Sequence, residues 1–436
     1  MPTPRNTAVE RLGAAEAVEH LRRRDLSAEE LVRACLRRIE EREPQVQAWA
    51  CLDPERALAE ARTRDAGPPR PPLYGLPVGI KDIIDTADAP TECGTALLRG
   101  RRPGRDAACV AALRAAGAVI LGKTVTTELA FFSPGPTRNP RGLERTPGGS
   151  SSGSAAAVAD FMAPAALGTQ TAGSIIRPAA FCGVVGFKPS HGTLSLQGVH
   201  PFAPSLDTLG VFAREVADLP VLLEALGSPV EVPVLHRPPR IGLWRTFRWE
   251  EATAAVQQRI EQVARVLAEA GAEVRVVTLG PDEAAVFEAQ TRIMASEATA
   301  SLRALRESSG AGLSQVLQEL LARGDAVGSE TYREDQLRAQ HGRLAAAELF
   351  RELDVLLTPT ASGEAPGVQT TGDPGFNRIP TLLGFPCLSL PAGVGPAGLP
   401  LGVQLVGAPR GEGALIAVAG WVAARLGARY PLPSST

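Results

Sequence analysis

Two serines and one lysine in this chain have the types and settings that nucleophilic catalysis requires. Ser150 lies in the glycine- and serine-rich segment 148–154, Ser174 closes a second run of small residues, and Lys81 follows a short apolar stretch. Segment 148–154 leads directly into a helix-forming alanine run, so we interpret it as a specific backbone geometry and not as a flexible linker. The three residues together predict an unusual serine hydrolase.

The base in such a site is predicted to be a lysine. A serine hydroxyl becomes a nucleophile only when a base removes its proton, and histidine is the usual base. None of the five histidines adjoins a nucleophile motif, so a Ser-His-Asp triad could arise only through spatial proximity. A G-x-S-x-G pattern centred on Ser151 lacks the preceding core strand of a nucleophile elbow. Lys81 could act as the base if burial lowers its pKa from about 10.4 towards about 7, which costs roughly 4 kcal/mol.

The segments around these residues resemble the amidase signature family of amide hydrolases. The resemblance runs from about residue 76 to 195, with 181–190 similar to the family's core segment after the nucleophile, and it continues at 358–360 and 384–387. It implies an α/β fold in which a large mixed β-sheet is flanked by α-helices. It also implies catalysis without a metal or an organic cofactor.

The resemblance assigns a role to each residue of the predicted site. By it, Ser174 is the nucleophile, Ser150 is a bridging serine held by a cis peptide bond, and Lys81 is the base. The backbone N–H groups that would form the oxyanion hole belong to Thr171, Ala172, Gly173 and Ser174. In the resulting cycle, neutral Lys81 takes a proton from Ser150 while Ser150 takes one from Ser174.

Two departures from the commonest family pattern bear on specificity. Asp-x-Gly-Gly-Ser is replaced by residues 170–174, Gln-Thr-Ala-Gly-Ser, and the alanine predicts a negative φ at Ala172. Arg177 stands three residues after the nucleophile, whereas the commoner arginine of the family stands two residues after it. The spacing of three resembles the malonamidase-like branch, in which the corresponding arginine holds the substrate's carboxylate. A guanidinium suits a bidentate clamp on a carboxylate, and the alternative is a structural ion pair with a buried acid.

Ser152 and Thr169 are further candidates for substrate binding. Their hydroxyls could contact the catalytic relay or the substrate, although hydroxyls in tight turns also cap local backbone. Asp207, by contrast, is interpreted as a turn or helix-cap acid and not as a catalytic residue.

The elements that must position these residues can be predicted in outline. Apolar periodicity predicts helices over about 9–41 and at 106–113, and core strands at 76–80, 118–121, 355–358, 387–390 and 402–406. Residues 252–353 are predicted to be mostly helical with one strand at 273–277, and a terminal helix is predicted to run through Trp421. We expect one amidase domain over residues 1–436, with a catalytic core at about 70–215 and 355–430 and a mostly helical insert at about 250–353.

Composition narrows the class of partner. The 45 basic and 47 acidic residues give a net charge of −2, which provides no global field for nucleic acid or an anionic membrane. The six widely spaced cysteines show no metal or redox spacing and predict buried free thiols. No signal peptide or membrane-spanning run is visible, so we expect a cytoplasmic protein. The expected partner is a small-molecule amide, and a homodimer follows from the family resemblance alone.

These observations predict a hydrolase that releases ammonia from a small, carboxylate-bearing primary amide similar to malonamate. One alternative is the amidase component of a tRNA-dependent amidotransferase, which needs partner subunits and ATP. An amidase for neutral amides is a second alternative. A catalytically idle relative is a third, and retention of Lys81, Ser150 and Ser174 argues against it.

Overall fold

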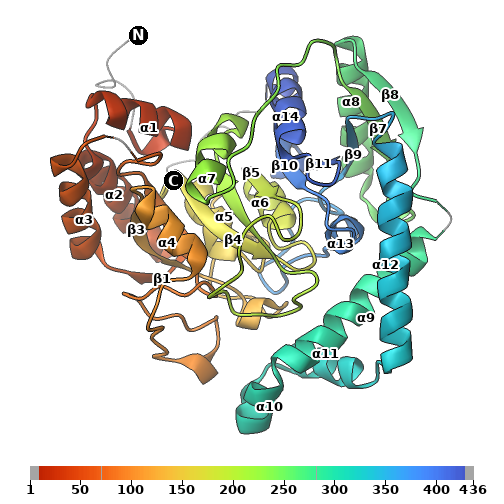
Figure 1. Cartoon of the computed structure of the whole chain (residues 1–436), viewed down its shortest axis with the longest axis horizontal. Coiled ribbons are helices and arrows are strands. Elements are labelled where there is room, and N and C mark those ends of the chain that lie inside the picture. The colour runs from red at the N-terminus through yellow and green to blue at the C-terminus, as the bar shows by residue number, and fades with distance from the viewer. Residues whose placement is uncertain (1–8, 70, 281, 428–436) are drawn as a thin grey trace.

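The computed structural model describes residues 9–69, 71–280 and 282–427 and is built around one eleven-stranded mixed β-sheet (Figure 1). The strands, in their order across the sheet, are β1 (Trp49–Leu52), β3 (Val119–Thr124), β2 (Pro77–Lys81), β4 (Ala165–Gln170), β6 (Thr208–Ala213), β5 (Val185–Lys188), β10 (Cys387–Val394), β11 (Pro400–Gly407), β9 (Val355–Pro359), β7 (Arg240–Trp244) and β8 (Glu273–Val277). This arrangement confirms the predicted α/β class.

Two parallel groups within the sheet are joined by antiparallel pairs. β2 runs parallel to both β3 and β4, and β7 runs parallel to both β8 and β9. The central pairs from β4 to β9 are antiparallel. Strands β2, β3 and β4 are buried along their whole length, including the polar residues at their carboxyl ends. Lys81 is the last residue of β2 and therefore lies at the carboxyl end of this parallel group.

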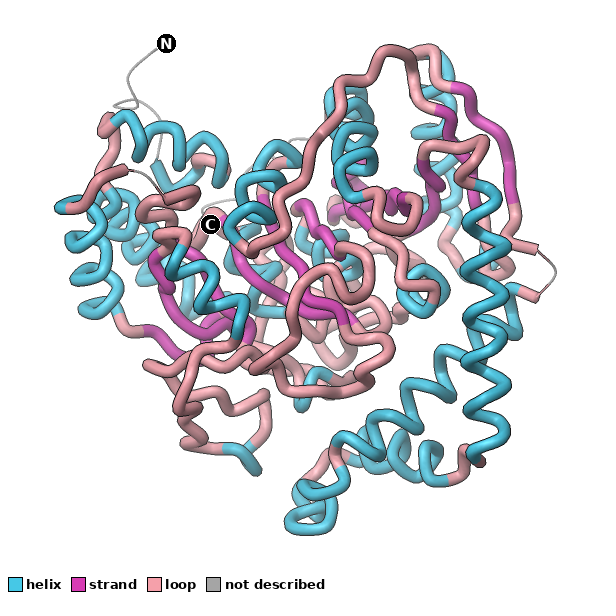
Figure 2. Tube along the Cα trace, viewed as in Figure 1, coloured by secondary structure: helices cyan, strands magenta, loops and turns pink. Residues whose placement is uncertain are grey.

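Helices cover the sheet and form one extension from it. They are α1 (Ala14–Arg23), α2 (Ala28–Val46), α3 (Pro54–Ala66), α4 (Ala108–Ala115), α5 (Ser152–Ala159), α6 (Ile176–Cys182), α7 (Leu219–Ala225), α8 (Ala254–Glu269), α9 (Glu283–Ser301), α10 (Arg303–Ser309), α11 (Gln315–Asp325), α12 (Ser329–Leu349), α13 (Gly375–Leu382) and α14 (Glu412–Leu426). α1 to α3 lie beside the β1 edge, and α9 to α12 form an arm beyond the opposite side, helical along most of its length (Figures 1 and 2). None of the helices described is long and apolar enough to cross a membrane.

The predicted helical region agrees with the structure, but its place in the fold is more complex than an insert. α8 packs on β9, β10 and β11, and β8 forms an edge of the main sheet. Only α9 to α12 extend away from the sheet as an arm (Figure 1). The division into a catalytic core and a helical insert stays a prediction.

The alanine run after the serine-rich segment forms α5, a helix with no exposed face. All eight of its residues are buried, so small side chains are needed on every side. At Gly153 an added Cβ would lie 2.2 Å from the carbonyl oxygen of Ala48 and 2.4 Å from the nitrogen of Val125. This close approach confirms that the segment is a packed structural element and not a linker.

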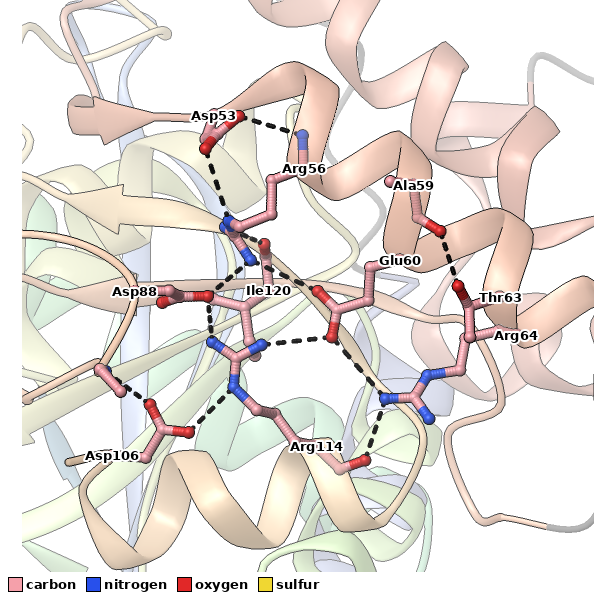
Figure 3. A network of polar contacts seen from close by, with 11 residues as sticks. Asp53, Arg56, Ala59, Glu60, Thr63, Arg64, Asp88, Asp106, Arg114 and Ile120 are labelled. Atoms are coloured by element: carbon pink, nitrogen blue, oxygen red, sulfur yellow. Dashed lines mark hydrogen bonds and ion pairs between the residues drawn. The ribbon is translucent and has the colours of Figure 1, made fainter.

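A polar network fastens α3 and α4 to the sheet edge (Figure 3). Arg114 on α4 reaches Glu60 at 3.2 Å, Asp88 at 2.6 Å and Asp106 at 3.0 Å. Arg56 on α3 also contacts Asp88, at 2.9 Å. Since these side chains are only partly exposed and share partners, the network should stabilise the fold more than isolated surface pairs do.

All three lysines of the chain are buried, and the charged cations of the surface are arginines. Lys81, Lys123 and Lys188 each have 0% exposure. Lys123 lies 3.1 Å from Asp82, while Lys188 donates to the carbonyl oxygens of Phe385, at 2.6 Å, and Pro189, at 3.0 Å. Buried ammonium groups require such partners, because transfer from water penalises their charged form.

Candidate active site

The structure brings the three predicted catalytic residues to elements around the neighbouring strands β2 and β4. Lys81 ends β2, Ser150 precedes α5, and Ser174 lies in the loop between β4 and α6. The Lys81 ammonium donates to Ser150 Oγ at 2.7 Å and to Thr169 Oγ1 at 2.8 Å. The peptide bond between Gly149 and Ser150 is cis, as the family resemblance implies.

Burial gives Lys81 the property that a neutral base needs. Desolvation lowers the pKa of Lys81 to about 7, and the negative charge of Asp207 acts in the opposite direction. At neutral pH, about half of the Lys81 side chains would then be unprotonated and able to accept a proton through Ser150.

Side chains from distant parts of the chain hold the loop 171–174. Thr381 on α13 donates to the carbonyl oxygen of Ala172 at 3.0 Å, and Gln290 on α9 donates to that of Thr171 at 3.1 Å. At Gly173 an added Cβ would lie 2.5 Å from Asn377 Oδ1, so only glycine fits. Among the described residues, the N–H groups of this loop have no hydrogen-bond acceptor, which leaves them free for an oxyanion.

Gln170 replaces the aspartate of the commoner motif and caps the helix after the nucleophile. Its side-chain oxygen accepts from the N–H groups of Ile175, at 2.9 Å, and Ile176, at 3.1 Å, and its nitrogen donates to Thr381 at 2.9 Å. The amide therefore meets the unpaired donors at the start of α6 without a carboxylate. Ala172 is absent from the positive-φ positions of the described chain, as predicted.

Asp207 has the structural role predicted from the sequence, and it also contacts the nucleophile loop. Asp207 Oδ2 accepts from the N–H groups of Phe202, at 2.8 Å, and Ala203, at 3.0 Å. Its other oxygen accepts from the hydroxyl of Thr171. Burial raises the pKa of Asp207 to about 6, whereas these hydrogen bonds favour the carboxylate.

A narrow pocket opens onto the two serines. It is lined by Ala130, Phe131, Phe132, Ser150, Thr171, Ala172, Ser174, Arg177, Phe202 and Met294. Its volume is about 10 Å³ for a water-sized sphere, which is room for about one water molecule. A substrate must therefore displace some of the apolar walls. Met294 belongs to α9, so the helical region contributes to the pocket wall.

Arg177 enters this pocket as a buried cation with unused donors. Its Nη2 donates to the carbonyl oxygen of Gly149 at 2.6 Å and to Thr371 Oγ1 at 3.3 Å. Nε and Nη1 are buried and have no partner among the described residues. Burial lowers the pKa of Arg177 to about 9, so it is still charged at neutral pH. The structural alternative required an ion pair with a buried acid, and the described chain places none there.

The other two candidates for substrate binding have partners within the protein. Ser152 Oγ donates to the carbonyl oxygen of Val125 at 3.3 Å, at the start of α5, and is not part of the pocket wall. Thr169 Oγ1 accepts from Lys81. Both hydroxyls thus serve the local structure and the relay, and their contact with substrate stays a prediction. Ser151 was not selected as a site residue. Its Oγ donates to the carbonyl oxygen of Thr169 at 3.2 Å and accepts from the backbone N–H of Thr169 at 3.3 Å.

Several residues that complete the site could not be identified from local sequence. Gln290, Met294 and Thr381 are separated from the nucleophile by more than a hundred residues and belong to no catalytic motif. The family resemblance at 358–360 and 384–387 does not include them, so no local signal could have identified them. Phe131 and Phe132 were missed because two adjacent apolar residues more often indicate core.

Comparison with known proteins places this site in a family. A family model described as Amidase matches residues 30–416. The glutamyl-tRNA(Gln) amidotransferase A subunit of Geobacter sp. (strain M21) is 36% identical over 461 residues, which cover 93% of this chain and 95% of that protein. An amidase crystal structure is 33% identical with a TM-score of 0.89, covering 95% of this chain and all of that one. The peptide amidase of Stenotrophomonas maltophilia is 32% identical with a TM-score of 0.81, covering 99% of both chains.

These findings correct one expectation about the branch. The similar curated proteins are amidotransferase A subunits, for example that of Anaeromyxobacter sp. (strain K), which is 36% identical and covers 97% of both chains. The malonamidase-like branch predicted from Arg177 has no support among them. The alternative that named an amidotransferase component is better supported by sequence similarity.

Proposed function

Because the chain belongs to the amidase family and is an amide-hydrolysing enzyme, we propose that its substrate is a primary amide bearing a carboxylate. The observation that carries this proposal is the buried Arg177, whose Nε and Nη1 have no partner among the described residues. An unpaired buried guanidinium is costly, and a substrate carboxylate would offset that cost through charged hydrogen bonds.

The proposed reaction proceeds through an acyl-enzyme. Ser174 loses its proton to Ser150 while Ser150 gives its own to neutral Lys81, and Ser174 Oγ attacks the amide carbon. The N–H groups of the loop 171–174 stabilise the oxyanion. The proton then returns through Ser150 to the leaving nitrogen, the C–N bond breaks and ammonia departs. Water hydrolyses the acyl-enzyme by the same relay, which regenerates the Ser174 hydroxyl and yields a carboxylic acid.

A second candidate is the amide-hydrolysing component of a tRNA-dependent amidotransferase. The curated relatives at 36% identity favour this candidate, and their similarity extends over most of both chains. The two candidates share the chemistry of amide hydrolysis and differ in their partners. The stand-alone enzyme needs only its amide, whereas the amidotransferase component would need partner subunits and ATP. Cytoplasmic location and homodimer formation stay predictions.

Ammonia release distinguishes these candidates. The purified chain would be given malonamate or acetoacetamide, which has a similar size but no charge, without ATP, and the Ser174→Ala variant would serve as the blank. Release that favours malonamate and is lost in the variant supports the proposal. Release from the neutral amide alone contradicts the carboxylate. The second candidate is supported if the purified chain by itself releases no ammonia but releases it after amidotransferase partner subunits, ATP and glutamine are added.

Arg177→Ala tests the clamp within the active enzyme. The loss in kcat/KM should be greater for malonamate than for acetoacetamide by roughly 1.5 to 3 kcal/mol, the value of a charged hydrogen bond. Arg177 also holds the carbonyl oxygen next to Ser150, so some loss is expected for both substrates. An equal loss for both would assign Arg177 to positioning Ser150 alone.

A further inference from the structure

Three arginines gather beside the pocket, and one loop connects them. Thr371 lies 3.3 Å from Arg177, and Asp373 pairs with Arg248 at 2.6 Å. The same segment continues into α13, which carries Arg378. The loop therefore links the buried guanidinium in the pocket to two cations further out.

Helix α9 shows how close the outer cations lie to the pocket. Arg378 Nη1 donates to Thr291 Oγ1 at 2.5 Å, and the Arg378 guanidinium carbon lies 5.0 Å from the ring centre of Phe287. Phe287, Thr291 and Met294 are spaced four and three residues apart, which places them on one face of the helix. Met294 lines the pocket, so Arg378 is bound about one helical turn, roughly 5 Å, from the pocket wall.

No carboxylate of the described chain binds Arg378 directly. Its Nε is buried without a partner, and no acid in the described chain forms an ion pair with it. The charges of Asp373 and Glu288 act on Arg378 without an ion pair. Asp373, whose charge also acts on Arg177, is bonded to Arg248. Burial lowers the pKa of Arg378, and the charge of Arg248 adds to this effect. One carboxylate at Arg177 would leave Arg378 without a directly bound anion.

We propose that Arg378 is a second anion-binding residue, so that the preferred substrate is a primary amide with two acidic groups. The group nearer the reacting carbonyl would bind Arg177, and the group further along the acyl chain would bind Arg378. Phe287 and Thr291 would hold the Arg378 guanidinium in place. This inference rests on the proposed carboxylate-bearing substrate and specifies its class.

Binding to a protein that cannot cleave the amide tests the inference directly. In the Ser174→Ala background, calorimetry would compare malonamate with the monoamide of propane-1,2,3-tricarboxylic acid, which has two carboxylates. Arg378→Gln should weaken binding of the dianionic amide roughly 10- to 100-fold more than binding of malonamate. Arg378→Lys should restore part of the difference because it keeps the charge.

Arg248→Gln is the matched control, since Arg248 lies against the same ring at 4.7 Å but is already paired with Asp373. Its effect on the two ligands should be equal. An equal effect of Arg378→Gln on both ligands, with unchanged thermal melting, would overturn the inference. So would tighter binding of malonamate than of the dianionic amide to the parent protein.

The same series separates this inference from the proposed function. If the wild-type chain releases no ammonia from either amide but the Arg378 difference in binding is present, the anion site stands and the proposed reaction fails. If malonamate is hydrolysed but Arg378→Gln does not discriminate between the ligands, the reaction stands and the second anion site is wrong.

Discussion

Replacing the predicted base, Lys81, should stabilise the folded protein at neutral pH. Lys81 is fully buried and its pKa is about 7 in the folded state, against an ordinary value of 10.5. At pH 6 the lysine is protonated in both states, and the shift corresponds to a penalty of about 5 kcal/mol on the folded state at about 1.36 kcal/mol per pKa unit. Lys81→Met removes the charge and therefore this penalty.

The sign of the pH dependence follows from the number of protons bound. Between pH 7 and 10.5 the unfolded lysine is protonated and the folded one is not, so the wild-type free energy of unfolding rises with pH. Above that window the penalty is absent. From pH 6 to pH 10 the advantage of Lys81→Met should therefore shrink by about 4 kcal/mol. The lost hydrogen bonds to Ser150 and Thr169 add a constant cost that does not change with pH.

Differential scanning calorimetry across this range measures the effect. A chain of 436 residues has an unfolding entropy that makes about 1 kcal/mol equivalent to about 1 °C, so the difference in Tm should change by about 4 °C. Ser174→Ala changes no group that titrates in this range and is the control, for which the difference should be constant. A constant difference for Lys81→Met as well would refute the argument that Lys81 is neutralised by burial.

Four other outcomes can be measured on the same protein. The kcat/KM for any accepted amide should fall about tenfold per pH unit below pH 7, where Lys81 becomes protonated, and a flat profile would contradict its role as base. Asp207→Asn should move this acidic fall in kcat/KM to lower pH, because the Asp207 charge raises the pKa of Lys81. Gln170→Ala removes the cap of α6, so it should lower the free energy of unfolding by about 1 kcal/mol and also lower kcat. An effect confined to KM would contradict this role of Gln170. Arg114→Ala should lower Tm without changing kcat, and unchanged melting would show that its network adds nothing.

The elements that sequence patterns predicted correctly are those with clear sequence signals at their ends. β2 begins and ends close to the predicted boundaries, and β8 interrupts a helical region as expected. β4 and β6, which flank the nucleophile loop, were not identified. Their residues are buried on both faces and include glycine, alanine and threonine, so they show neither period-two alternation nor a strong apolar run. Burial of these strands is a property of the assembled sheet.

The candidate site divides in the same way between local and distant information. Ser150, Ser174 and Lys81 could be selected because each lies in an unusual local setting. The Thr381 contact to the Ala172 carbonyl joins residues separated by 209 positions, and no spacing rule reports it. The unpaired state of Arg177 likewise depends on which acids the fold places elsewhere. The sequence could name the chemistry and, by resemblance, predict a carboxylate-bearing substrate, while the unpaired donors that support this proposal depend on the three-dimensional arrangement.

The burial of all three lysines has a consequence for work with the protein in the laboratory. Acylating reagents for amines, lysine-directed cross-linkers and coupling to activated supports all need an accessible, unprotonated amine. Lys123 and Lys188 are buried and held by internal partners, whereas Lys81 stands behind the pocket and is neutral in part at pH 7. Modification of the native chain at a lysine side chain should therefore be slow. Any that occurs at Lys81 would report, through mass spectrometry, how often the pocket opens.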